Sequence, residues 1–140
     1  MRYLLHVDGA CRGNPGPGSA AAVVLDESGA VLAERGFHLG VTTNNVAEYT
    51  ALIRGLELVR ECAAKRRELP EVLVRTDSEL MVMQLTGRYR VRHPRLKPLY
   101  AKARTLLDAM PGSAVEHVPR ERNRDADALA NRVLDVGHDV

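Results

Sequence analysis

The chain has few of the residues that small domains use for cross-links or for large aromatic cores. Its 140 residues include no tryptophan, one phenylalanine and two cysteines. Two cysteines form neither a disulfide framework nor a cysteine-based zinc site, so Cys11 and Cys62 are expected to be plain thiols. Because 45% of the residues are hydrophobic but few are aromatic, the core must be mainly aliphatic.

Long apolar runs and a strong excess of one charge are also missing. No stretch is apolar enough to span a bilayer and no secretory signal is evident, which predicts a cytoplasmic protein without membrane contact. The net charge is only +2, so a nucleic-acid site would have to come from local clustering of basic residues. The length and the lack of repeats or linkers predict one domain, residues 1–140.

The apolar patterning predicts an α/β fold with a five-stranded mixed sheet flanked by helices. Three early strands are separated by two segments that interrupt regular structure, a Gly/Pro-rich loop over residues 13–18 and a turn at 27–29. This arrangement is typical of an antiparallel meander. Later strands are followed by helices, so crossover connections should make them parallel to the first. The expected strands are 3–10, 20–25, 31–38, 72–76 and 114–118, and the expected helices are 44–63 (capped by Thr43 or Asn44), 79–85, 96–109 and 124–134.

Four acidic residues stand in distinct local motifs. Any one of them alone would be taken for an ordinary surface acid among the 18 in the chain. Asp8 and Asp77 are expected at strand ends, and Glu48 lies one helical turn before Leu52, beside the buried face. A carboxylate there is costly unless it pairs with a metal or with a basic side chain. The motifs are Val7-Asp8-Gly9-Ala10, Thr43-Asn44-Asn45 preceding Glu48, Thr76-Asp77-Ser78, and Ala126-Asp127-Ala128.

In their order, these motifs resemble type 1 ribonuclease H over nearly the whole chain. Two further motifs carry the resemblance, Gly13-Asn14-Pro15-Gly16 and Arg120-Glu121-Arg122-Asn123. The resemblance implies endonucleolytic hydrolysis of the RNA strand of an RNA/DNA hybrid, giving 5′-phosphate and 3′-hydroxyl ends. It also implies two Mg²⁺ ions, with Mn²⁺ as a substitute. Carboxylates suit these hard cations, and paired metals cleave phosphodiesters.

The resemblance also implies roles for single residues. Asp8 would bridge both metals, Glu48 and Asp77 would complete one metal site, and Asp127 would complete the other. Selection of RNA requires contacts to the 2′-hydroxyl. The residues expected at the hybrid are Gly9, through close backbone approach, Asn14, Asn44, Asn45 and Glu48, through 2′-hydroxyls or base edges, and Thr43, through a phosphate of the DNA strand. For Asn44 and Asn45, helix capping alone is an alternative.

Two departures place the chain nearer the compact branch of that family. The separate basic protrusion is missing, and the shorter stretch Gly87–Pro94 stands in its place. Arg120 occupies the region of the family's loop histidine. A guanidinium stays charged near neutral pH, so Arg120 would attract the scissile phosphate or help product release; the alternative is a solvated arginine paired with Glu121.

Basic residues cluster in the second half of the chain. Residues 80–107 contain seven lysines and arginines and no acid, which favours phosphate contact over a merely solvated face. The arginines expected to hold the hybrid are Arg88, Arg90, Arg92 and Arg95. Three histidines, His6, His93 and His117, lack a surrounding motif and are expected to be structural or exposed.

The sequence therefore predicts a metal-dependent ribonuclease H, monomeric, with an RNA/DNA hybrid as its partner. One alternative is a non-catalytic module that binds hybrids or RNA on the same fold, since one fold hosts many functions. Another is a nuclease that acts on DNA. The presence of all four acids disfavours the first, and the expected 2′-hydroxyl contacts of Asn14, Asn44 and Glu48 disfavour the second.

Overall fold

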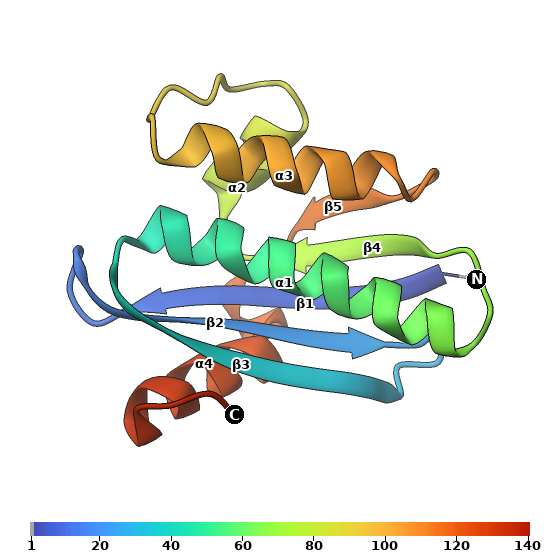
Figure 1. Cartoon of the computed structure of the whole chain (residues 1–140), viewed down its shortest axis with the longest axis horizontal. Coiled ribbons are helices and arrows are strands. Elements are labelled where there is room, and N and C mark those ends of the chain that lie inside the picture. The colour runs from blue at the N-terminus through green and yellow to red at the C-terminus, as the bar shows by residue number, and fades with distance from the viewer. Residues whose placement is uncertain (1) are drawn as a thin grey trace.

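A single five-stranded sheet organises the computed structural model, which describes residues 2–140 (Figure 1). The strand order is β3-β2-β1-β4-β5. Strands β1, β2 and β3 form the expected antiparallel meander, and β4 and β5 run parallel to β1. The bounds are β1 Arg2–Cys11, β2 Gly16–Leu25, β3 Val31–Thr42, β4 Glu71–Thr76 and β5 Ala114–His117.

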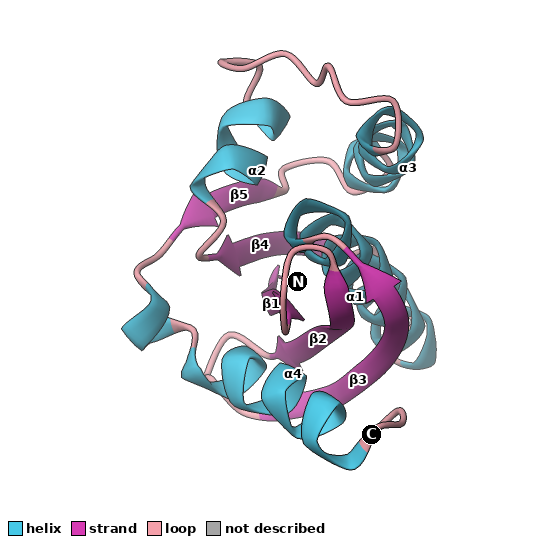
Figure 2. Ribbon diagram, turned by 90° about the vertical axis from the view of Figure 1, so that its left-hand side faces the viewer, coloured by secondary structure: helices cyan, strands magenta, loops and turns pink. Residues whose placement is uncertain are grey.

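Helices cover both faces of the sheet (Figure 2). Helix α1 (Asn44–Lys65) packs across β1 and β2 with α3 (Leu96–Asp108) beside it, while α4 (Arg124–Val136) packs on the opposite face. Helix α2 (Glu79–Leu85) lies against β5, and a single 3-10 turn, η1 (Arg120–Arg122), precedes α4. The predicted mixed sheet flanked by helices is confirmed. No helix within residues 2–140 is long and apolar enough to cross a membrane.

The core divides along the two faces because side chains alternate in a strand. On β1, Tyr3, Leu5 and Val7 pack into the large cluster beneath α1, whereas Leu4 joins the smaller cluster beneath α4. Strand β2 divides in the same way, with Ala22 and Val24 on one side and Ala21 and Val23 on the other. The buried side chains are mainly Ala, Val and Leu, as the scarcity of aromatic residues predicts.

The strands are longer than the sequence predicts. Residues 16–18 were expected in a loop, but Gly16 pairs with Thr42 and Gly18 with Cys11. Asp8 therefore lies inside β1 and not at its end. Glycine is required at Gly16 for close backbone approach, because a Cβ there would lie 2.2 Å from the Arg12 carbonyl oxygen. Glycine in this segment thus serves the tight β1–β2 connection while the strand pairing continues through it, and local pattern reading mistakes the segment for a loop.

Candidate active site

Three carboxylates from separate elements meet at one edge of the β1–β4 pairing. Asp8 lies on β1, Glu48 in the second turn of α1 and Asp77 directly after β4, and one oxygen from each lies within 4.8 Å of the others. Strand β4 pairs with β1 only as far as His6 opposite Arg75. The residues that follow in the two parallel strands therefore bring Asp77 beside Asp8.

A glycine allows Glu48 to join this group. A Cβ on Gly9 would lie 2.4 Å from both the Ala47 carbonyl carbon and the Glu48 amide nitrogen. Helix α1 thus crosses β1 in direct backbone contact, and any larger residue would have to push the helix away. Gly9 positions Glu48 through the backbone, in addition to the substrate contact that the family resemblance implies.

The three carboxylates repel one another in a poorly solvated site. Asp8 is only 4% exposed, and burial, followed by repulsion from Asp77 and Asp127, raises its pKa to about 8. Burial and the charges of Asp8 and Asp77 raise the pKa of Glu48 well above its usual range, and Glu48 Oε2 is buried without a hydrogen-bond partner. Hard divalent cations would relieve this repulsion and use the unpaired oxygen, so the residues fit a metal site.

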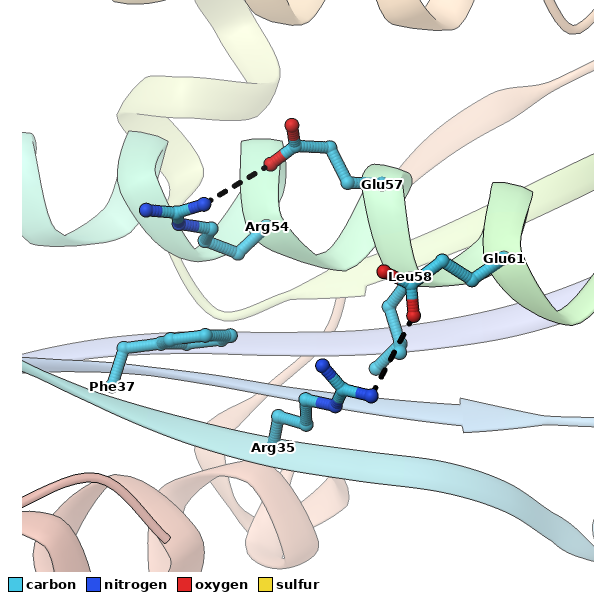
Figure 3. Close-up of a pocket in the computed structure, with 6 residues that line it drawn as sticks. All are labelled: Arg35, Phe37, Arg54, Glu57, Leu58 and Glu61. Carbon is cyan, nitrogen blue, oxygen red and sulfur yellow. Dashed lines mark ion pairs between the residues drawn. The ribbon is translucent and has the colours of Figure 1, made fainter.

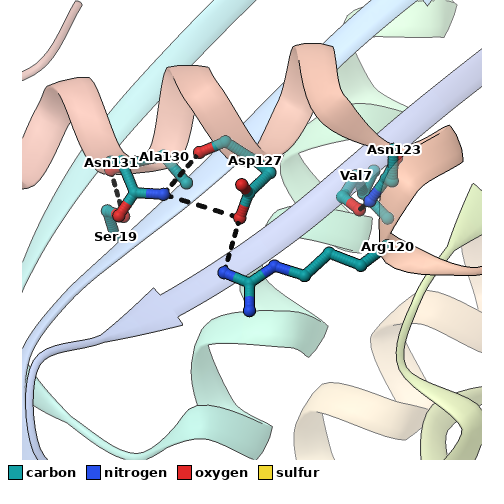
Figure 4. A network of polar contacts seen from close by, with 7 residues as sticks. All are labelled: Val7, Ser19, Arg120, Asn123, Asp127, Ala130 and Asn131. Carbon is teal, nitrogen blue, oxygen red and sulfur yellow. Dashed lines mark hydrogen bonds and ion pairs between the residues drawn. The ribbon is translucent and has the colours of Figure 1, made fainter.

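Asp127 approaches from α4 on the other side and stands apart from the group of three. Its carboxylate accepts hydrogen bonds from Arg120 Nη2 at 3.1 Å and from Asn131 Nδ2 at 3.5 Å (Figure 4). Asp127 and Asp8 nevertheless line the same hollow, and the charge of Asp127 contributes to the raised pKa of Asp8. The Arg120 side chain is 72% exposed and forms its ion pair with Asp127. The alternative of a solvated arginine paired with Glu121 is therefore wrong about the partner.

The start of α4 is anchored on β1 by a buried asparagine. Asn123 is fully buried and its Nδ2 donates to the Val7 carbonyl oxygen at 2.9 Å (Figure 4). Two turns further on, Ser19 Oγ donates to the Ala130 carbonyl oxygen at 2.8 Å. These bonds join α4 to β1 and β2 on both sides of Asp127, so its backbone position is determined by the sheet.

The carboxylates open into a hollow of about 290 Å³. Asn44 and Arg120 line it, as do two residues that the sequence did not single out, Arg12 and Asn131. Asn131 lies four residues after Asp127 on one helix, a spacing that places both side chains on one face and could have indicated it. Burial and the nearby Glu48 raise the pKa of the Cys11 thiol, which keeps it protonated and agrees with the prediction of a plain thiol.

A second hollow, of about 240 Å³, lies beside the start of α1. Thr43 is the helix cap, since its Oγ1 accepts the Val46 amide at 3.4 Å, so the side chains of Asn44 and Asn45 are not the cap. Asn14 Oδ1 accepts the Asn44 amide at 3.1 Å and ties the β1–β2 loop to α1. The hollow is lined by Asn14, Thr43, Asn45, Val46, Leu96 and His93, the last of which the sequence suggested only as structural or exposed.

The basic segment between α2 and α3 is exposed and irregular. Among residues 2–140, none of its arginines forms an ion pair with an acid. Tyr89 is 53% exposed between them and, with Arg88, Arg90, Lys97 and Tyr100, lines a hollow of about 520 Å³. The structure does not bring these arginines into the carboxylate hollow.

A further hollow of about 140 Å³ lies between α1 and β3, with charges of both signs (Figure 3). Arg54 stacks over Phe37 with 5.4 Å between the guanidinium carbon and the ring centroid, and pairs with Glu57 at 3.7 Å. Arg35 pairs with Glu61 at 3.6 Å. The paired charges leave no net attraction for a charged ligand.

Comparison with known proteins agrees with this architecture. The profile of the family described as reverse transcriptase-like matches residues 6–133. Ribonuclease HI of Halobacterium salinarum is 42% identical over 134 residues, which cover 96% of this chain and 65% of that protein. The bifunctional protein Rv2228c of Mycobacterium tuberculosis is 43% identical over 137 residues, or 97% of this chain and 36% of that protein. The chain thus spans only part of these curated relatives.

Two solved structures match nearly the whole chain. The crystal structure of RNase H1 from Halobacterium salinarum matches with a TM-score of 0.87 and 41% identity, covering 96% of this chain and 98% of that one. LC11-RNase H1, solved in complex with an RNA/DNA hybrid, matches with a TM-score of 0.89, 43% identity and coverage of 96% and 98%. The chain therefore belongs to the type 1 ribonuclease H family.

Proposed function

We propose that residues 1–140 form one catalytic domain that hydrolyses the RNA strand of RNA/DNA hybrids endonucleolytically, with 5′-phosphate and 3′-hydroxyl products. The observation that carries the proposal is the convergence of Asp8, Glu48 and Asp77 on one point, with Asp127 opposite. The family membership supports it, as does the relative LC11-RNase H1, which was solved with a hybrid bound.

Two Mg²⁺ ions, or Mn²⁺ in their place, are the proposed cofactors. Asp8 would contact both, Glu48 and Asp77 would hold one, and Asp127 would hold the other. When bound, such ions supply an activated water and offset the negative charge that develops on the phosphate. The protein holds the carboxylates on β1, β4, α1 and α4, so little reorganisation is required during the reaction.

RNA selection is assigned to the glycine and the amide side chains around α1. Gly9, Asn14 and Asn44 border the carboxylates or the α1 terminus, where a 2′-hydroxyl can donate and accept hydrogen bonds. Thr43 and Asn45 line the second hollow, where Thr43 at the helix N-terminus would hold a phosphate of the DNA strand and Asn45 would contact a 2′-hydroxyl or a base edge. His93 lines the same hollow and is added as a phosphate contact. Its Nδ1 accepts the Arg95 amide at 3.1 Å, which leaves Nε2 to donate.

Arg120 and the basic segment are assigned electrostatic roles. Arg120 sits beside Asp127 at the mouth of the site, where its fixed positive charge attracts the scissile phosphate. Arg88, Arg90, Arg92 and Arg95 would hold the DNA strand further from the chemistry. Contacts of this kind position a nucleic acid without reading its sequence.

A cleavage assay on matched substrates tests the proposal. The purified chain is incubated with RNA/DNA hybrid, double-stranded RNA and double-stranded DNA of one sequence, with Mg²⁺ or with a chelator. Cleavage of the hybrid RNA strand alone, only with Mg²⁺, and its loss in Asp8→Asn, is expected. Hybrid binding without cleavage would instead indicate the non-catalytic module, and cleavage of the DNA duplex would indicate a DNA nuclease.

A further inference from the structure

A histidine and an aspartate outside the carboxylate group join the same strand and helix. His6 on β1 contacts Asp125 on α4, with Nδ1 lying 2.9 Å from Oδ2 and 3.0 Å from Oδ1. The His6 side chain is only 13% exposed. A carboxylate only accepts hydrogen bonds, so the proton of this bond is on Nδ1. The contact joins residues 119 positions apart in the sequence.

This pair runs alongside the two carboxylates that face each other. His6 precedes Asp8 by two residues in β1, so strand periodicity places both side chains on the α4 face. Asp125 precedes Asp127 by two residues in the first turn of α4. The distance between β1 and the start of α4 therefore governs both the His6–Asp125 contact and the approach of Asp127 to Asp8.

The geometry around His6 is not what packing alone would favour. Its Nε2 is buried without a hydrogen-bond partner, which costs stability that an apolar side chain of similar size would not. The other anchor of this helix end is the bond from Asn123 to Val7. The bond from Ser19 to Ala130 and the buried Ala126 hold the helix further along, and the His6–Asp125 contact adds a second polar bond between β1 and the first turn of α4 itself.

We propose that His6 and Asp125 are a positioning pair that holds the first turn of α4 at the separation where Asp127 can share a metal ion with Asp8. This inference rests on the proposed function, since it assigns the pair to the same metal site. Neither residue contacts the reacting atoms; the pair acts through Asp127. When residues that orient metal ligands are substituted, metal affinity or activity falls roughly 10–100-fold.

The test measures binding of Mn²⁺ alone by calorimetry, and separately kcat and KM for the hybrid. His6→Leu and Asp125→Ala should each weaken Mn²⁺ binding about tenfold and lower kcat at limiting metal, with the KM for the hybrid unchanged. The double variant should lose no more than either single variant, because one contact is removed. His6→Asn should stay near the parent, because Asn Nδ2 occupies the place of His Nδ1.

Stability measurements separate positioning from simple packing. His6→Leu removes the orphaned nitrogen and should unfold at the parent's temperature or above, although it binds Mn²⁺ more weakly. Glu61→Ala breaks the remote Arg35–Glu61 pair between β3 and α1 and serves as the matched control, with parental Mn²⁺ affinity expected. If Asp125→Ala fails to fold, His6→Leu carries the test.

Several results would overturn the positioning pair. Parental Mn²⁺ affinity in a folded His6→Leu variant would do so, as would additive losses in the double variant or an equal loss in Glu61→Ala. The calorimetric result is independent of cleavage. If the unsubstituted protein does not cleave hybrids, the proposed function is refuted. The effect of His6→Leu on Mn²⁺ binding would still show whether His6 and Asp125 position Asp127.

Discussion

The carboxylate site and the basic segment between α2 and α3 differ in how the protein holds their charges. Asp8 is buried and Glu48 is half-buried, both on regular elements, and their charges repel one another. Arg88 and Arg90 stand on an exposed segment without ion pairs to acids among residues 2–140. Chemistry requires groups fixed to a fraction of an ångström, whereas a phosphate backbone can be held by mobile charges. Substitutions should therefore act sharply at the first region and gradually at the second.

The largest effect is expected from Asp8→Asn, which removes the central carboxylate. Cleavage should fall by about 10³-fold or more, equivalent to roughly 4 kcal/mol of transition-state stabilisation. Hybrid binding should remain, because the basic segment and the amides of α1 are untouched. Single-turnover assays beside a binding titration check this, and substantial Mg²⁺-dependent turnover in the variant would refute the role of Asp8.

The same variant gives a pH test of the crowded charge. The Asp8 pKa is 3.8 in an unfolded chain and about 8 in the folded one. The unfolded state therefore binds fewer protons between these values, and the metal-free protein loses stability as pH rises from about 4 to about 8. Asp8→Asn should reduce this slope and add about 1–3 kcal/mol at pH 8. Urea unfolding in the presence of a chelator at pH 5 and pH 8 measures the change in unfolding free energy. If this free energy depends on pH in Asp8→Asn as it does in the parent, the raised pKa of Asp8 is not the cause.

Two glycine substitutions compare the regions through one added methyl group. Gly9→Ala forces α1 away from β1, since the new Cβ would meet backbone at 2.4 Å, and should lower kcat about 10²-fold by displacing Glu48. At Gly87 nothing lies within 4 Å, but φ is +80°, so Gly87→Ala should cost about 1 kcal/mol of stability and leave kcat unchanged. Equal losses of kcat in the two variants would mean that the regions do not differ as described.

Replacement of Arg88, Arg90, Arg92 and Arg95 by alanine should act on binding alone. Each lost phosphate contact should reduce the log–log dependence of affinity on salt by about one unit, so hybrid affinity should fall roughly 10–100-fold near 0.1 M salt. The saturated cleavage rate should remain nearly parental, because these contacts position the substrate. Titrations at several salt concentrations measure both quantities. If the dependence of hybrid affinity on salt concentration is unchanged, these arginines are a solvated surface that does not contact the hybrid.

The smallest effect is expected from Arg120, whose side chain is 72% exposed and carries a charge beside Asp127. Arg120→Ala should lower activity about tenfold or less, and Arg120→Lys should recover part of it. Because a guanidinium does not titrate near neutral pH, the shape of the pH–rate profile should be retained. Loss of one titration step in Arg120→Ala would assign it a part in proton transfer.

Local patterns accounted for most of the secondary structure, and for the group of acids once the motifs were read together. They were wrong about the Gly16–Gly18 segment, because glycine there serves the tight β1–β2 connection, where a Cβ on Gly16 would meet the Arg12 carbonyl oxygen, while the strand pairing continues through the segment. They also missed Arg12 and Asn131 in the carboxylate hollow and His93 beside Thr43. Arg12 and His93 carry no distinctive motif, and the hollows that they line also include residues from distant parts of the chain, whereas the position of Asn131 four residues after Asp127 was a signal that could have been read.

The sequence by itself determined the alternation of strands and helices, the aliphatic core and the four acids, since these follow from periodicity, composition and short motifs. Only the tertiary structure decided which charges meet. It placed Asp8, Glu48 and Asp77 within 4.8 Å of one another, paired Arg120 with Asp127 in place of Glu121, and joined His6 to Asp125. The physical reason is that burial and charge–charge distances depend on how β1, β4, α1 and α4 pack, and short sequence motifs do not encode the distances between side chains on different elements.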